Sequence, residues 1–144
     1  MEASDVNVKI VTTQTVDGES ETFCTETNGT LYHRDGSGFS LTYTEPDEEL
    51  FGSETSVTLC DGVLTVERGD ALTLTVEAGV KTDGMYRMPF GSMPMSVGGK
   101  TVTFDSGDDY LYVHAVYTLE TEGQLFSEND IKLTVQLLYA DSLL

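Results

Sequence analysis

Four polar side chains share the strand parity of apolar neighbours, which places them on faces that we expect to be buried. Arg68 follows Val66 in one alternating run. Tyr43 and Glu45 end a second run, and Tyr117 belongs to a third. Residues two apart lie on the same face of a strand. If the apolar faces line a core, all four polar side chains point into it or to its rim.

A guanidinium inside a core needs a carboxylate, backbone carbonyls or a bound anion, because an unpaired buried charge is costly. In one interpretation, Arg68 and Glu45 form a structural ion pair that plugs one end of the core. In a second, Arg68 binds the carboxylate of a ligand in bidentate fashion, and tyrosine hydroxyls orient it. A third is a cofactor-free acid–base enzyme built from Tyr, Arg and Glu. We favour binding over catalysis because no nucleophile–base pair is evident in the sequence.

A methionine-rich segment at residues 85–97 would add an adaptable apolar lining to such a pocket. The methionines of this segment are Met85, Met88, Met93 and Met95. Pro89 and Pro94 indicate an edge strand or an irregular one. We therefore hypothesise that the protein binds a small, partly apolar molecule with an anionic group. The predicted ligand-binding residues are Tyr43, Glu45, Arg68, Tyr86 and Tyr117.

The histidines and cysteines do not cluster in the sequence. His33 and His114 lack the local spacing of metal-binding motifs, so we expect no metal site and no cofactor. Cys24 and Cys60 lie outside any CxxC motif. A disulfide would require their Cα atoms to come within about 7 Å of each other. In a reducing compartment we expect both to be free thiols.

Short alternating runs separated by Gly, Asp, Asn and Ser recur along the chain, which predicts strands joined by turns. The clearest strands are residues 110–119 and 131–137. Asp–Gly pairs at residues 17–18 and 61–62 predict hairpins, because a type I′ turn needs positive φ at both central residues. Gly98 and Gly99 predict another turn, and we expect a break in the strands between residues 78–79 and 83–84. Residues 28–29 are compatible with a bulge, a bend or a hairpin.

No segment has the apolar spacing of a long helix, so sequential strands should pair as antiparallel neighbours. We predict an all-β fold in which residues 1–144 form a single domain. Its architecture should be one antiparallel meander barrel of about eight to ten strands. A barrel is favoured over a sandwich because closure removes the edges that Thr-rich strands would expose. The chain also has no Trp, which an immunoglobulin-type core would contain.

The chain is strongly acidic, with 7 Lys and Arg against 25 Asp and Glu and a formal net charge of −18. Such a surface repels phosphate backbones and anionic headgroups, which argues against nucleic acid and membrane partners. No apolar run approaches the ~20 residues of a membrane span. The N-terminus starts with Met and lacks the basic and apolar regions of a secretory signal, so we expect a cytoplasmic protein.

In the strand at residues 110–119, the residues that alternate with the buried ones should face the outside of the barrel, where they predict a contact surface. An exposed stripe rich in tyrosine is typical of a protein interface. We therefore expect that a homodimer could form through this face, which consists of Tyr110, Tyr112, His114 and Val116. In that alternative the barrel is filled by its own side chains and acts as an interaction module. The other alternative is that another segment of the chain covers the stripe.

Five short segments, taken in order, resemble the YwiB-like family, which consists of small bacterial proteins described as a domain of unknown function. The resemblance extends from about Val6 to Leu138. The segments are VKIVTTQ at 8–14, LTYTE at 41–45, LTVERG at 64–69, YRMPFG at 86–91 and YTL at 117–119. Membership would imply a calycin-type, lipocalin-like β-barrel, and it would imply no established activity.

The same resemblance marks several positions of this chain as recurring in the family. They are Tyr43, Glu45, Arg68, Gly69, Tyr86, Gly91 and Tyr117. This chain departs from the family pattern after Tyr86, where Met88 and Phe90 replace Thr and Tyr. Any chemistry that depended on those two hydroxyls would be missing from this member.

Overall fold

The computed structural model describes residues 3–35, 38–44, 54–69, 72–88, 91–122 and 124–138. For residues 33–35, 86–88, 92 and 93 it describes the backbone alone. The elements are β1 (Ser4–Val16), β2 (Glu19–Asp35), β3 (Gly38–Thr44), β4 (Glu54–Cys60), β5 (Val63–Arg68), β6 (Leu72–Glu77), β7 (Lys81–Met88), β8 (Gly91–Ser106), β9 (Tyr110–Thr121) and β10 (Gln124–Leu137). Within these described ranges, no helix is long and apolar enough to cross a membrane.

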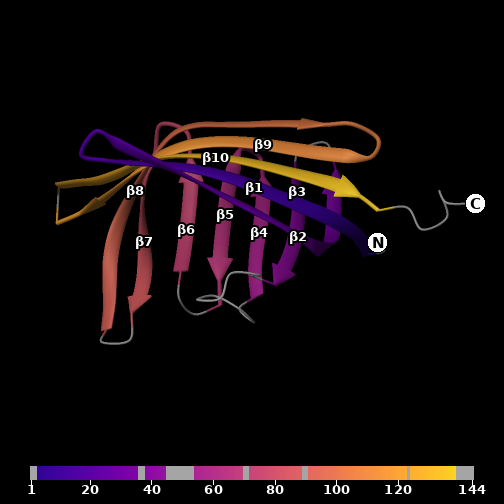
Figure 1. The fold of residues 1–144 in the computed structure, drawn as a ribbon, viewed down its shortest axis with the longest axis horizontal. Coiled ribbons are helices and arrows are strands. Elements are labelled where there is room, and N and C mark those ends of the chain that lie inside the picture. Colours follow the sequence, from indigo (N-terminus) through magenta and orange to yellow (C-terminus); the bar gives the residue numbers. More distant parts are fainter. Residues whose placement is uncertain are drawn as a thin grey trace, which may run out of the picture.

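The strands form a closed antiparallel barrel in which each strand pairs with its neighbours in sequence, and β1 pairs with β10 to complete the circle (Figure 1). The prediction of an all-β antiparallel meander barrel of about eight to ten strands is confirmed, with ten strands observed. The long strands β1, β9 and β10 run alongside one another and lie across the shorter strands β4 to β6 (Figure 1).

Both predicted Asp–Gly hairpins are present. Asp17 and Gly18 have φ values of 52° and 79°, and they join β1 to β2. Asp61 and Gly62 have φ values of 49° and 83°, and they join β4 to β5. Positive φ at both central residues matches the right-handed twist of the flanking strands. These turns fix the register of their two strand pairs.

The predicted turn at Gly98 and Gly99 is wrong, because both residues lie inside the continuous strand β8. A Cβ atom at Gly99 would lie 2.0 Å from the carbonyl oxygen of Glu77. The Gly99 amide also donates to the Val80 carbonyl, and the Gly79 amide donates to the Gly99 carbonyl. Glycine here therefore permits two backbones to approach closely, which is its other common role in strands.

Two further glycine pairs lie inside strands. The break predicted between residues 78–79 and 83–84 is present but shorter: β6 ends at Glu77 and β7 begins at Lys81, so Asp83 and Gly84 already lie inside β7 and pair with β8. Asn28 and Gly29 lie within β2, so the hairpin alternative is excluded there. A Cβ atom at Gly29 would lie 2.5 Å from the carbonyl oxygen of Thr42 on β3. Close packing of the neighbouring strand explains this glycine as well.

One end of the barrel is filled by its own side chains. Phe39 packs against Phe104 of β8, with ring centroids 5.8 Å apart. The most buried core side chains are at most 1% exposed, and they include Val6, Val8, Phe39, Leu41, Leu111, Val113 and Val135. Each such side chain contributes roughly 1.5–3 kcal/mol through its burial. The predicted inward parity of β9 is confirmed by this set.

Candidate functional site

A cavity of about 510 Å³ opens at the other end of the barrel, toward the β1–β2 and β9–β10 hairpins. Most of its lining is apolar, and its walls come from both the long and the short strands. The lining residues are Thr12, Gln14, Phe23, Val66, Arg68, Leu72, Leu74, Met95, Tyr117, Leu119, Phe126, Asn129 and Ile131. The barrel is thus filled at one end and hollow at the other.

Tyr117 is the most strongly perturbed titratable group in this cavity. Its side chain is 5% exposed, and in the sheet it lies opposite Gly99 on one side and Asn129 on the other. Burial raises the pKa of Tyr117 to about 12, although the positive charge of Arg68 acts in the opposite direction. The phenol is therefore protonated at neutral pH and can donate a hydrogen bond.

Arg68 ends β5 and contributes the only positive charge among the described residues that line the cavity. Its side chain is half-buried, and its Nε atom is buried. Two described lysines instead form ion pairs on the outside: Lys81 lies 2.9 Å from Glu120, and Lys100 lies 3.9 Å from Glu128. Arg68 thus lies in a partly buried and mostly apolar cavity, where a charge interacts more strongly than in the exposed lysine ion pairs.

A buried polar pair lies beside Tyr117 on β10. Asn129 is 4% exposed and Ser127 is 1% exposed. The Nδ2 atom of Asn129 donates to the Oγ atom of Ser127 over 2.9 Å. This hydrogen bond gives each buried polar side chain a partner, which lowers the free-energy cost of burying it.

The structure brings two of the five predicted ligand-binding residues together at the cavity, Arg68 and Tyr117. Tyr43 is buried on β3 at 4% exposure, but it does not belong to the described cavity lining. Tyr86 lies on β7 opposite Leu72, a residue of the cavity wall, and its side chain is outside the described set. Glu45 is outside the described residues.

Sheet register explains how separate strands carry the predicted residues into one row. Tyr43 lies opposite Thr55, Thr55 opposite Arg68, and Arg68 opposite Leu72. Directly opposed residues of an antiparallel sheet lie on the same face. The inward parity predicted for Arg68 and Tyr43 is therefore confirmed. Only Arg68 and Leu72 of this row line the cavity, so the row extends beyond it.

The predicted methionine lining is confirmed at one position and wrong at another. Met95 is 6% exposed and lines the cavity. Met85 is 43% exposed and lies opposite Pro94, one residue out of step with Met95. A shift of one residue places a side chain on the other face of the sheet. The side chains of Met88 and Met93 fall outside the described set.

Sequence reasoning missed several cavity residues, although their parity offered a signal. Asn129 has the parity of Ile131, and Gln14 has the parity of Ile10. Polar residues that precede the apolar run of β10 do not by themselves indicate that the strand extends to them and that their side chains face the interior. Phe126 was also missed, because it lies at a register shift between Leu125 and Ser127 that breaks the alternation.

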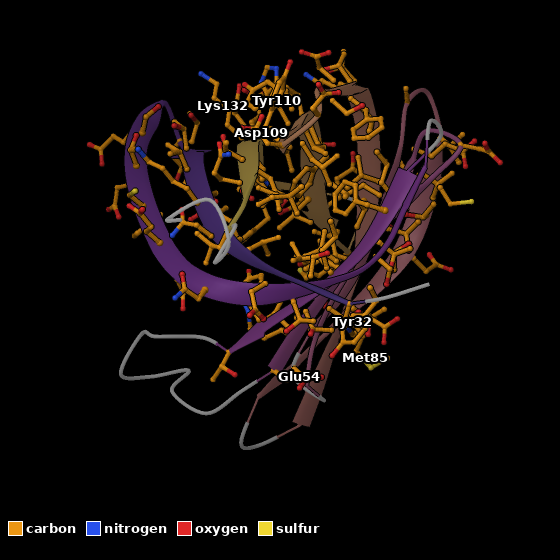
Figure 2. All side chains as sticks on the ribbon, turned by 90° about the vertical axis from the view of Figure 1, so that its right-hand side faces the viewer. Tyr32, Glu54, Met85, Asp109, Tyr110 and Lys132 are labelled. Atoms are coloured by element: carbon orange, nitrogen blue, oxygen red, sulfur yellow. The ribbon has the colours of Figure 1, made fainter. Side chains whose placement is uncertain are left out.

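The outer face of β9 carries polar contacts in addition to its tyrosines. The Tyr110 hydroxyl donates to the Oδ2 atom of Asp105 over 3.1 Å. This hydrogen bond and the Asp105 charge raise the pKa of Tyr110. The Nε2 atom of His114 lies 3.0 Å from the Oδ1 atom of Asp130. Figure 2 shows Tyr110 and Lys132 on the outside of the barrel.

The described part of the chain contains no group of three or more His, Cys, Asp or Glu residues arranged to hold a metal ion. Cys24 and Cys60 are both exposed and are not joined by a disulfide, as the sequence predicted. The candidate site is therefore the cavity that Arg68 and Tyr117 line.

The crystal structure of the ywiB protein from Bacillus subtilis matches with a TM-score of 0.81 and 19% sequence identity, covering 95% of this chain and 94% of that chain. No curated protein matches the sequence. At this level of identity the ywiB structure supports the fold, and the resemblance predicted from the sequence motifs is confirmed. With its residues 8–133 matching the family model, the chain belongs to the family described as Domain of unknown function (DUF1934).

Proposed function

We propose that this barrel binds a small molecule with an apolar body and an anionic group in the cavity at its hairpin end. The observation that carries the proposal is the placement of Arg68 and the buried Tyr117 in one cavity whose other walls are mostly apolar. As part of the same proposal, we assign the barrel to the calycin class, resembling lipocalins, and to the cytoplasm.

The size and walls of the cavity support a small ligand. Its volume of about 510 Å³ is within the ~300–1,000 Å³ usual for small-molecule sites. Apolar side chains from β5, β6, β9 and β10 face the space, namely Val66, Leu72, Leu74, Leu119 and Ile131. Contact with these side chains would favour the apolar body of a ligand.

The polar groups support an anion. A guanidinium can bind a carboxylate, sulfate or phosphate group through two parallel hydrogen bonds. A phenol whose pKa is about 12 stays protonated at neutral pH and donates the third hydrogen bond. The same pKa weighs against Tyr117 as a general base near neutral pH, which supports binding over acid–base catalysis.

The first experiment compares two fluorescent probes of similar shape. Anilinonaphthalene sulfonate is anionic, and phenylnaphthylamine is its neutral counterpart. We expect Arg68→Gln to weaken sulfonate binding by about 10- to 100-fold, because a hydrogen bond to a charged group is worth about 1.5–3 kcal/mol. Binding of the neutral probe should change by less than about threefold, since apolar contacts remain.

Lys132→Gln is the matched control, because it removes one positive charge from an exposed position on the outside of the barrel. It should leave the affinity for both probes unchanged. Circular dichroism and thermal unfolding establish whether each variant is folded. If folded Arg68→Gln binds the sulfonate as the wild type does, the proposal fails. If Arg68→Gln unfolds, the structural plug is supported, and Tyr117→Phe tests the cavity instead.

Native mass spectrometry of the freshly purified protein complements the probes. A reproducible small adduct that leaves on denaturation would report the class of the natural ligand. The adduct should disappear from Arg68→Gln and persist in Lys132→Gln.

A further inference from the structure

Two exposed phenylalanines line the entrance of the cavity. Phe23 on β2 is 51% exposed, and Phe126 on β10 is 48% exposed, and both belong to the cavity lining. Strand β1 lies between the two strands that carry them, with Thr12 opposite both Phe23 and Ile131. Exposed aromatic side chains at the mouth of a pocket gain free energy when an apolar group covers them.

The polar groups lie deeper than these phenylalanines. Tyr117 is 5% exposed and Asn129 is 4% exposed, against about half for each rim phenylalanine. The Nε atom of Arg68 is buried as well, although the residue as a whole is half-buried. The buried part of the cavity thus contains polar groups beside apolar side chains such as Leu74 and Met95, whereas the two phenylalanines are largely exposed.

The charges beside the rim also favour one orientation. Phe126 and Leu125 line a shallow depression together with Asp17 and Glu128. Asp17 and Glu128 are both exposed carboxylates. An anionic group held at the rim would be repelled by them, whereas inside the cavity it would meet the positive charge of Arg68.

We infer that the ligand enters with its anionic group first and leaves its apolar end between Phe23 and Phe126. This inference rests on the proposed function and narrows it to a class of ligand, a narrow amphipathic monoanion such as a medium-chain alkanoate. Substituents at the apolar end extend past the rim and are tolerated.

The orientation can be measured because the protein contains no tryptophan. Phe126→Trp places a single fluorophore at the rim. Bromine quenches indole emission on contact, so two isomeric ligands report which end of the chain is near it. The ω-bromododecanoate carries bromine at the apolar end, and α-bromododecanoate carries it beside the carboxylate. We expect saturating ω-bromo ligand to quench at least fivefold more than the α-bromo ligand.

Tyr32→Trp serves as the control, since Tyr32 is 50% exposed and does not belong to the described cavity lining. It should be quenched by neither ligand. Native mass spectrometry of the wild type, with unsubstituted dodecanoate, counts binding independently of the tryptophan. If Phe126→Trp does not fold, Phe23→Trp places the same reporter on the opposite side of the rim.

The outcomes separate the orientation from the proposed function. Stronger quenching by the ω-bromo ligand supports entry with the anionic group first. Equal quenching, or stronger quenching by the α-bromo ligand, overturns the orientation but leaves binding in the cavity intact. If dodecanoate and both bromo ligands fail to bind the wild type in native mass spectrometry, the ligand class is overturned. The sulfonate probe then decides separately whether the cavity binds anions at all.

Discussion

Tyr117 shows how its surroundings set the chemistry of a single residue in this protein. Its strand position is that of a core residue, between apolar side chains at the same parity. Burial removes the water that would stabilise a phenolate, and Arg68 offsets only part of that loss. The residue is therefore a neutral hydrogen-bond donor over the physiological pH range, which is the property that the binding proposal uses.

The same burial predicts a specific loss of stability in alkaline solution. The pKa of Tyr117 rises from 10.0 in the unfolded chain to about 12 in the folded protein. The unfolded state thus loses its proton first, so the contribution is present in full below pH 10 and is lost as the pH approaches 12. A rise of about two pKa units corresponds to about 2–3 kcal/mol in the free energy of unfolding.

Urea unfolding of the wild type and Tyr117→Phe from about pH 8 upward measures this loss. Because other tyrosines titrate in both proteins, only the difference between their free energies of unfolding is informative. That difference should shift by about 2–3 kcal/mol against the wild type across the alkaline range. Tyr32→Phe, which removes an exposed hydroxyl, should show no such shift. Parallel pH curves for the wild type and Tyr117→Phe would show that the phenol is not buried as described.

At the scale of elements, β8 connects two parts of the barrel. Its first half pairs with β7, and residues 96–106 pair with β9. Only two residue pairs join β6 to β7, so contacts between β6 and the middle of β8 contribute to closure there. Gly99 lies at this crossing, against the backbone of Glu77. The barrel depends on a residue without a side chain at this point.

Alanine at Gly99 should therefore destabilise the barrel strongly. Its Cβ atom would meet the Glu77 carbonyl oxygen at 2.0 Å, and backbone cannot move aside as a flexible side chain can. We expect a loss of about 1–3 kcal/mol or more in the free energy of unfolding, measured by chemical denaturation.

Gly98→Ala is the matched control for this substitution. Its Cβ atom would meet only the Thr118 hydroxyl, at 2.6 Å, and a side-chain rotation can relieve that contact. The loss should be clearly smaller than for Gly99→Ala. Equal losses at the two positions would contradict the close backbone crossing.

At the scale of the whole molecule, the proposed dimer face must be reconciled with a net charge of −18. Two such surfaces repel each other unless apolar contact outweighs the repulsion. The outer face of β9 offers Tyr112 and Val116, and its Tyr110 and His114 contact Asp105 and Asp130 within the same chain. We propose that any homodimer uses this face.

Tyr112→Glu tests the dimer by adding a charge at the centre of the face. Tyr112 lies opposite Asp105 on β8 and Thr134 on β10, so the new carboxylate would add to an existing negative charge. We expect the wild type to elute as a dimer in size-exclusion chromatography and the variant as a monomer. An unchanged elution volume would count against this interface. Lys132→Glu, on the neighbouring strand, tests whether the effect extends across the face.

The sequence alone determined most of the strands, though not the full lengths of β2, β7 and β8, together with the two Asp–Gly hairpins and the inward parity of Arg68, Tyr43 and Tyr117. These features were predictable because side-chain alternation and turn conformation depend on residues close together in the chain. Once alternating strands are joined by short turns, antiparallel neighbours follow, and closure is the simplest way to cover the edges. The family resemblance agreed with that reading.

Only the tertiary structure decided which of the inward residues share a cavity. Arg68 and Tyr117 lie on β5 and β9, and their proximity depends on the register of every strand pair between them, including the register shift of β8 between Gly99 and Thr101. A shift of one residue reverses the face, as at Met85, and a bulge brought Phe126 to the entrance. Local patterns determine which face a side chain takes. The hollow end arises from the closure of the whole barrel, because the distance across it depends on packing among strands far apart in the sequence.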